Sequence, residues 1–157
     1  MKKIMLIVCA IFLLIGCTKK VDSSDLSCVN QIYYFKGKPF TGVSIGYYSS
    51  GNVFYKTDFK NGRENGFFLL YSQSGNLQLK AGYKDGFLNG EQFIYYDSGS
   101  LFTKSHYIHG QLTGEVIEYY ESGSIKSKKL YKNWKIVGVP VNYNENGKII
   151  KTASSLQ

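Results

Sequence analysis

The chain has 157 residues, which suits one domain, and its three cysteines exclude a disulfide framework as the basis of the fold. It carries 19 Lys and Arg residues against 11 Asp and Glu residues, a formal net charge of +8. Such a basic balance predicts anionic neighbours.

The first sixteen residues have the organisation of a signal peptide. Lys2 and Lys3 precede an unbroken apolar run over residues 4–15, which closes on Gly16. That run is shorter than the roughly 20 apolar residues that cross a bilayer, and it suits a secretory leader. We therefore predict a signal peptide over residues 1–16.

Residues 14–17 read Leu-Ile-Gly-Cys, two aliphatic residues and a small residue before a cysteine. This stretch resembles the lipobox of bacterial lipoproteins, and the resemblance implies that Cys17 carries lipid and becomes the mature N-terminus. It also implies a membrane-anchored place in the cell envelope, at the outer membrane if the host has two membranes. An ordinary cleaved leader and an uncleaved anchor are the alternatives.

We predict that residues 17–33 form a lipidated tether. Residues 18–30 are polar and poor in aromatics, and a flexible stretch of that length reaches roughly 20 Å. Cys28 is then the one thiol left, either an incidental residue or a reactive one. Without Lys2 and Lys3 the mature chain holds 17 basic and 11 acidic residues. Phospholipid headgroups or wall polymers are the expected anionic neighbours, and nucleic acid is not expected for an exported protein.

Five copies of a 24-residue repeat fill the rest of the chain, and we predict a repeat domain over residues 34–153 with a tail over 154–157. Four columns keep the step without an insertion: Gly42, Gly66, Gly90, Gly114 and Gly138; Tyr47, Tyr71, Tyr95, Tyr119 and Tyr143; Gly51, Gly75, Gly99, Gly123 and Gly147; and Phe35, Phe59, Tyr83, Tyr107 and Tyr131.

Each copy predicts two short strands and two tight turns. In the copy over residues 58–81, Asn61-Gly62 is a two-residue turn signal, and a run of about six residues ends at Tyr71. A polar turn over residues 72–76 then leads to a second run over residues 77–83. The fold class is therefore all-β, an elongated antiparallel β-meander of five hairpins in a single twisted sheet.

Period-two counting predicts the faces of this sheet. On the first strand of each copy, the tyrosine and the apolar residue two positions before it are predicted to share the core face. On the second strand, Val53 is predicted to share that face with Tyr55 and Phe59, and its equivalents likewise. The opposite parity carries the lysines, about 10 Å apart. One face would be aromatic and aliphatic, and the other cationic.

The ends of the array differ from its middle. Pro39 and Pro140 lie in the first and last copies, where proline discourages edge-to-edge association. Trp134 replaces the turn glycine of the last copy, as a packing cap or alternatively as a binding aromatic.

The third copy runs from Tyr83-Lys84-Asp85-Gly86 through Tyr95-Tyr96 to Gly99 and Leu101. This pattern resembles the variant MORN repeat, and such bacterial arrays resemble the YwqK-family antitoxins of toxin–antitoxin systems. The resemblance covers about three quarters of the chain. It implies an elongated hairpin array that binds protein or membrane, with no catalytic residue to transfer.

Few residues suggest chemistry. His106 and His109 lack a third ligand for zinc, and no metal site is predicted. Glu91 and Glu115 are equivalent positions about 10 Å apart, slightly too wide even for an inverting glycosidase. No nucleophile–base pair or phosphate loop is present. We therefore expect neither an enzyme nor a cofactor.

The predicted function is a lipid-anchored, non-catalytic scaffold that binds a protein partner through a sheet face, because Tyr and Trp anchor protein interfaces. The resemblance extends this to toxin neutralisation or immunity. The candidate contact residues are Tyr71, Tyr95, Tyr96, Tyr119, Tyr120, Lys56, Lys80, Lys104 and Lys128. The alternative is a basic module that adsorbs to anionic lipid or cell-wall polymer through its lysines, which in the plainer reading only solvate the outer face.

Overall fold

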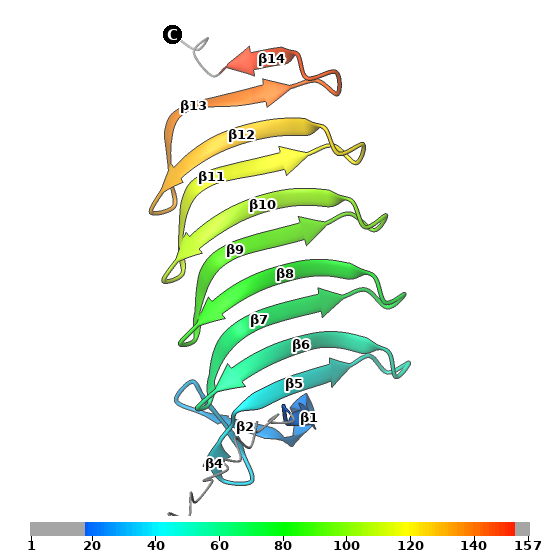
Figure 1. Ribbon diagram of the computed structural model, residues 1–157, viewed down its shortest axis with the longest axis vertical. Coiled ribbons are helices and arrows are strands. Elements are labelled where there is room, and N and C mark those ends of the chain that lie inside the picture. Colours follow the sequence, from blue (N-terminus) through cyan, green and yellow to red (C-terminus); the bar gives the residue numbers. More distant parts are fainter. Residues whose placement is uncertain (1–17, 153–157) are drawn as a thin grey trace, which may run out of the picture.

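The computed structural model describes residues 18–152, and five β-hairpins, one for each 24-residue copy, make up most of them (Figure 1). The hairpins are β5 (Gly42–Tyr47) with β6 (Val53–Lys60), β7 (Arg63–Tyr71) with β8 (Leu77–Lys84), β9 (Phe87–Tyr95) with β10 (Leu101–Ile108), β11 (Gln111–Tyr119) with β12 (Ile125–Lys132), and β13 (Lys135–Tyr143) with β14 (Ile149–Thr152). Each of these strands pairs antiparallel with its sequence neighbours among them. The predicted all-β meander is confirmed.

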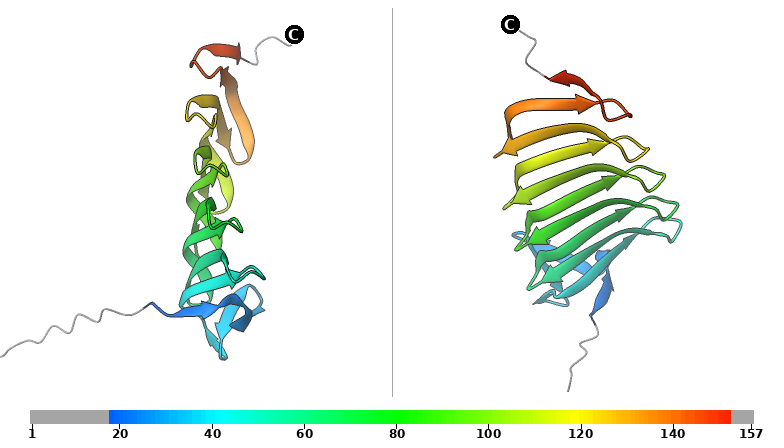
Figure 2. Two further views of the ribbon diagram at one scale, coloured as in Figure 1. Left: turned by 90° about the vertical axis from the view of Figure 1, so that its right-hand side faces the viewer. Right: turned by 45° about the horizontal axis from the view of Figure 1, so that its top comes forward.

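The residues before β5 form an N-terminal cap, which we define as residues 18–41. β1 (Lys20–Asp22) pairs parallel with β5 and completes an 11-stranded sheet. A short 3-10 helix, η1 (Ser23–Asp25), leads into a separate three-stranded sheet of β2 (Leu26–Val29), β3 (Ile32–Phe35) and β4 (Lys38–Pro39). The cap lies at one end of the array, and the sheet beyond it is a single layer (Figure 2).

The cap corrects two predictions, the single sheet and the flexible linker over residues 18–30. Val21 of β1 packs with Phe40 and Phe59 in a buried cluster, which Leu26 and Tyr33 border. The amide of Val43 donates a hydrogen bond of 2.8 Å to the carbonyl of Lys19. The apolar end of a single-layer sheet needs a cover, and burial of these side chains orders the segment that supplies it.

The tight turns explain why the 24-residue spacing of the repeat is so regular. Asn61 and Gly62 both have positive φ, 51° and 79°, as a two-residue hairpin turn requires. In the last copy Asn133 and Trp134 keep the same geometry without glycine. The first copy differs from the others. Its turn is at Lys36-Gly37, one residue earlier than the 24-residue spacing predicts, and it joins β3 to β4 in the cap. Phe35 therefore leaves the aromatic column.

A β-bulge in each second strand alters the faces. Tyr47 pairs with Val53 whereas Gly46 pairs with Tyr55, so Phe54 is the extra residue. The same shift recurs at Gln78, Phe102, Lys126 and Ile150. Because one extra residue reverses the alternation, Val53 lies on the face of Tyr47, and the prediction that it shares the face of Tyr55 is wrong.

Cross-strand pairs identify the two faces, because directly opposed residues point to the same side of a sheet. Leu69 is opposed by both Lys56 and Lys80, so the lysines share the face of the tyrosine column. We call this side the lysine face. One row across it alternates apolar and basic residues: Ile45, Lys56, Leu69, Lys80, Phe93, Lys104, Ile117, Lys128 and Val141. The predicted division into an apolar and a cationic face is wrong, since the bulges set the register.

The opposite side, which we call the cap face, holds the buried core. Val21, Phe40 and Phe59 form one cluster at the cap, and Tyr107, Leu112 and Val116 form another near the middle of the array. The last strand is open by comparison, with Ile149 and Ile150 exposed by 55% and 59%. Among residues 18–152, no helix is long and apolar enough to cross a membrane.

Candidate functional site

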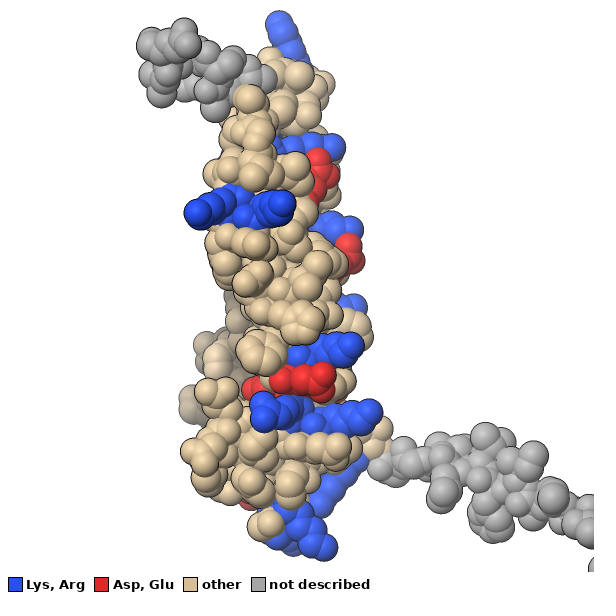
Figure 3. All heavy atoms as spheres, turned by 90° about the vertical axis from the view of Figure 1, so that its left-hand side faces the viewer, with Lys and Arg blue, Asp and Glu red and all other residues tan. Residues whose placement is uncertain are grey.

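The lysine face brings together most of the residues predicted to contact a partner. Tyr71, Tyr95 and Tyr119 end β7, β9 and β11 in one row, and the lysine row runs parallel to it. Neighbouring strands lie about 4.8 Å apart, so successive lysines are about 10 Å apart. Seen from the edge of the tight turns, basic and acidic side chains stack along one side of the array (Figure 3).

The charge of this face is not uniform along the array. Lys104 pairs with Glu91 at 2.5 Å, and Lys128 lies 4.0 Å from Glu115. The hydrogen bond from Lys104 to Glu91 raises the pKa of that lysine. Lys104 also lies 5.7 Å from the ring centroid of Phe93, so the equivalent lysines nearer the cap differ from it in their acidic partners and not in their aromatic ones.

Lys56 lies 5.5 Å from the ring centroid of Tyr71, and Lys80 lies 4.3 Å from that of Phe67. Neither lysine has an acidic partner within residues 18–152. The uncompensated positive charge of the row is therefore concentrated in the half of the array next to the cap.

Tyr96 and Tyr120, also predicted as contact residues, have a structural role. Each hydroxyl donates a hydrogen bond of 2.8 Å to a main-chain carbonyl one copy further on, Tyr96 to Tyr119 and Tyr120 to Tyr143. Tyr48 makes the same bond to Tyr71. These hydroxyls tie neighbouring hairpins together at the longer turn, and the second copy lacks the bond because Ser72 occupies the position.

The remaining singled-out residues are spread over the molecule. Cys17 lies outside the described residues, and Cys28 is a free, exposed thiol in β2. The Trp134 ring packs edge-on against Tyr107 at 5.8 Å, yet it remains 58% exposed. Residues 18–152 contain no group of three or more His, Cys, Asp and Glu side chains that could hold a metal ion.

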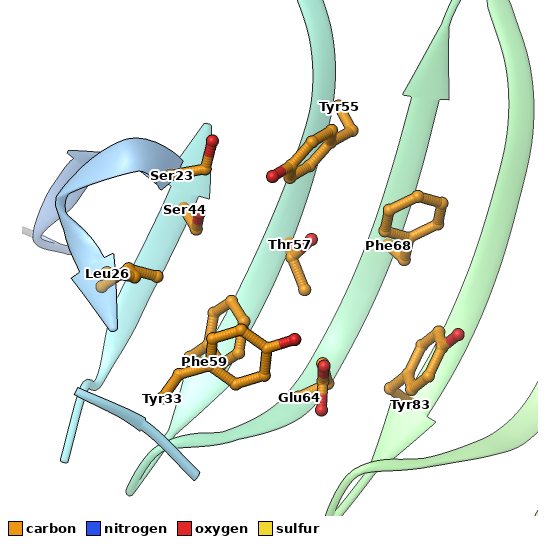
Figure 4. Close-up of a pocket in the computed structure, with 10 residues that line it drawn as sticks. All are labelled: Ser23, Leu26, Tyr33, Ser44, Tyr55, Thr57, Phe59, Glu64, Phe68 and Tyr83. Atoms are coloured by element: carbon orange, nitrogen blue, oxygen red, sulfur yellow. The ribbon is translucent and has the colours of Figure 1, made fainter. Parts of the chain in front are cut away.

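A pocket beneath the cap was not predicted from the sequence. Its volume is about 270 Å³, and the cap covers one side of it with Ser23, Leu26 and Tyr33. The cap face supplies the other side from β5 to β8, including four aromatic rings, as Figure 4 shows. The pocket could not be predicted from the sequence, because three of the ten residues that line it belong to the predicted tether.

Glu64 introduces a negative charge at the pocket. Burial raises the pKa of Tyr33 and of Tyr83, and the nearby Glu64 carboxylate raises both further. The sequence did contain a signal for this residue. Equivalent positions of the later copies carry Leu88, Leu112 and Ile136, so Glu64 breaks an otherwise aliphatic column.

Three stretches of the chain match the family model described as the MORN repeat variant, at residues 40–61, 88–109 and 112–133. They correspond to the hairpins β5–β6, β9–β10 and β11–β12. A search of curated proteins found no match to the chain.

Proposed function

We propose that this chain, which carries repeats of the MORN variant type, is a lipid-anchored, non-catalytic scaffold of the cell envelope that binds a protein partner through its lysine face. The observation that carries the proposal is the row of half-buried Tyr71, Tyr95 and Tyr119 beside the alternating row of lysines and apolar side chains. Tyrosines supply large contact area at low entropic cost, and the lysines favour a partner with acidic groups around an apolar patch.

Anchoring at Cys17 would hold the cap end of the array close to the membrane. β1 begins at Lys20, so only three residue steps, at most about 10 Å, separate the lipid-bearing residue from the sheet. The scaffold would therefore act in a thin layer above the bilayer, with the cap end nearest to it. A Cys17→Ser variant is expected to lose fatty-acid labelling and to leave the membrane fraction, and unchanged labelling would contradict the anchor.

Photo-crosslinking from adjacent positions on opposite faces tests the partner. A photoreactive residue replacing Tyr95 samples the lysine face, whereas one replacing Ile94 samples the cap face. We expect a discrete protein adduct from position 95 that the Lys80→Glu change weakens. Equal adducts from both positions, or none from position 95, would refute binding through the lysine face.

Toxin neutralisation is the specific form of this function that the resemblance to antitoxins suggests. Its signature is growth arrest when the crosslinked partner is expressed alone and recovery when this chain is expressed with it. A partner without any effect on growth would exclude immunity while leaving the scaffold role in place.

Adsorption to anionic lipid or wall polymer is the second candidate, and the absence of acidic partners for Lys56 and Lys80 within residues 18–152 favours it. Its signature is salt dependence, because the Debye length falls to about 3 Å at 1 M salt. Vesicle binding that persists at that ionic strength would exclude it.

A further inference from the structure

The Glu64 carboxylate occupies a position where packing favours an aliphatic residue. It is opposite Phe59, and the equivalent pairs are Tyr83 with Leu88, Tyr107 with Leu112 and Tyr131 with Ile136. Leu112 is buried in the mid-array cluster, where it contributes to the core. A half-buried carboxylate forgoes that contribution and carries a desolvation cost.

No group of the described chain compensates this charge. Within residues 18–152 the Glu64 side chain forms neither an ion pair nor a hydrogen bond. Its neighbour Arg63 is opposite Lys60 and not Phe59 and forms no ion pair with it, although its guanidinium and the Glu64 carboxylate lie 3.9 Å and 3.7 Å from the position that a Cβ on Gly86 would take. A bound cation would compensate this partly buried and unpaired anion.

Aromatic rings line the walls on both sides of this carboxylate. Tyr33 and Phe59 lie 4.8 Å apart, between ring centroids, on the cap side. On the sheet side Phe68 lies 6.0 Å from Tyr55 and 6.4 Å from Tyr83. In Figure 4 the Tyr33 hydroxyl points toward Glu64. Because ring faces are electronegative, such walls attract a cation and shield it from water.

Buried hydroxyls add hydrogen-bond acceptors at the same cavity. Ser44 and Thr57 line it and are 2% and 6% exposed. Neither hydroxyl is hydrogen-bonded to another part of the chain between residues 18 and 152. The next copy has Phe68 and Ala81 at these positions, and the third copy repeats only one of the two hydroxyls, that of Ser105, which bonds to Gln92. Each hydroxyl can accept a hydrogen bond from an N–H group of a ligand, and a quaternary ammonium has no such group.

We propose that the cavity beneath the cap binds a protonated primary amine, with its ammonium group between Glu64 and the aromatic rings and its N–H groups donated to the carboxylate and the buried hydroxyls. The volume of about 270 Å³ suits a short alkylamine, such as the end of a lysine side chain or an aminoethyl headgroup, and not a large ligand. This inference is independent of the proposed function, because the cavity opens on the cap face.

Isothermal titration calorimetry of the full chain with n-butylammonium tests the proposal, with n-butanol as a neutral probe of the same shape. We expect saturable binding of the amine, no comparable binding of the alcohol, and weaker binding of tetramethylammonium. O-phosphoethanolamine is titrated in parallel. Binding of either amine supports the site, and the tighter one identifies a side chain or a headgroup as the source. An alcohol or tetramethylammonium that binds as tightly as butylammonium would overturn the proposal.

Two substitutions separate binding from folding. Glu64→Gln keeps the shape of the side chain, and removing the charge is expected to weaken butylammonium binding about tenfold or more. Glu64→Leu restores the residue of the later copies, so it should fold at least as well as the parent by circular dichroism while losing the amine. Glu91→Gln on the lysine face is the matched control and should leave the affinity unchanged. Equal affinity in Glu64→Gln and the parent would overturn the assignment.

Discussion

The hydroxyl of Tyr96 offers a direct test of how neighbouring copies are held together. It donates a hydrogen bond of 2.8 Å to the carbonyl of Tyr119 from a partly buried position. Tyr96→Phe removes only that hydroxyl and leaves the ring in contact with Phe102 at 5.0 Å. One such bond contributes about 1 kcal/mol net, so the free energy of unfolding should fall by about that amount.

For a chain of this size, a loss of about 1 kcal/mol corresponds to a fall in Tm of roughly 3–5 °C. Thermal unfolding followed by far-ultraviolet circular dichroism and by tyrosine fluorescence measures it, and coincident transitions would justify a two-state reading. Repeat arrays can unfold in parts, so both probes are needed.

Tyr95→Phe is the matched control, since the Tyr95 hydroxyl forms no hydrogen bond within residues 18–152. Its Tm should stay close to that of the parent. An unchanged Tm in Tyr96→Phe, or an equal fall in Tyr95→Phe, would refute the assignment of the second tyrosine column to inter-copy bonding.

Four further predictions follow from other contacts. Ser72→Tyr should raise Tm by a few degrees, because it supplies the missing inter-copy bond at the cost of two exposed hydrogen bonds of the Ser72 hydroxyl, to Ser74 at 2.8 Å and to the Asn76 amide at 3.1 Å. Gly66→Ala should destabilise the fold by more than Gly75→Ala, since both have positive φ but only the first places a Cβ 2.5 Å from the Asp58 carboxylate; denaturant midpoints compare them. The hydrogen bond from Lys129 lowers the pKa of Glu118 below its ordinary 4.5, so the stability that this pair contributes is present above pH 4.5 and is lost as the pH falls through the lowered pKa. Between pH 6 and pH 3, the free energy of unfolding should therefore fall less in Lys129→Met than in the parent, whereas Lys128→Met should behave like the parent. Val21→Ser should speed amide exchange at Val43, whose N–H is bonded to Lys19, whereas a truly flexible segment would leave that amide unprotected in the parent as well.

The hairpins could be predicted because their determinants are local. Asn61-Gly62 and Asp85-Gly86 need positive φ at both residues, and few residue pairs other than these adopt it readily. The faces could not be predicted in the same way. Phe54 and its equivalents are bulged, and nothing in the run from Val53 to Lys60 marks which residue leaves the alternation. One extra residue per strand moved the lysines onto the side of the tyrosines.

The cap and its pocket depend on contacts that are distant in sequence. β1 is three residues long and has no periodic pattern of its own, and Val21 becomes a core residue only through Phe40 and Phe59. Pattern reading therefore assigned a linker to residues that bury apolar surface. Glu64 was visible as an exception to its column, but its meaning required the position of the cap above it.

The five copies share their backbone conformation and differ in the side chains on their two faces. Near the cap, Glu64 replaces an aliphatic residue, and Lys56 and Lys80 lie over aromatic rings. Farther along, Lys104 forms an ion pair with Glu91 and Lys128 with Glu115, so the positive charge of these lysines is compensated within the sheet. The turn glycines and the second tyrosine recur because the turns and the inter-copy bonds require them. The first tyrosine and the lysines recur as well, and the charge around them is what differs between copies: Phe67 occupies the position of Glu91, and Glu64 that of Leu88. Exchanging Glu64 and Phe67 for their counterparts in the third copy should remove amine binding and weaken binding at the lysine face while leaving the array folded.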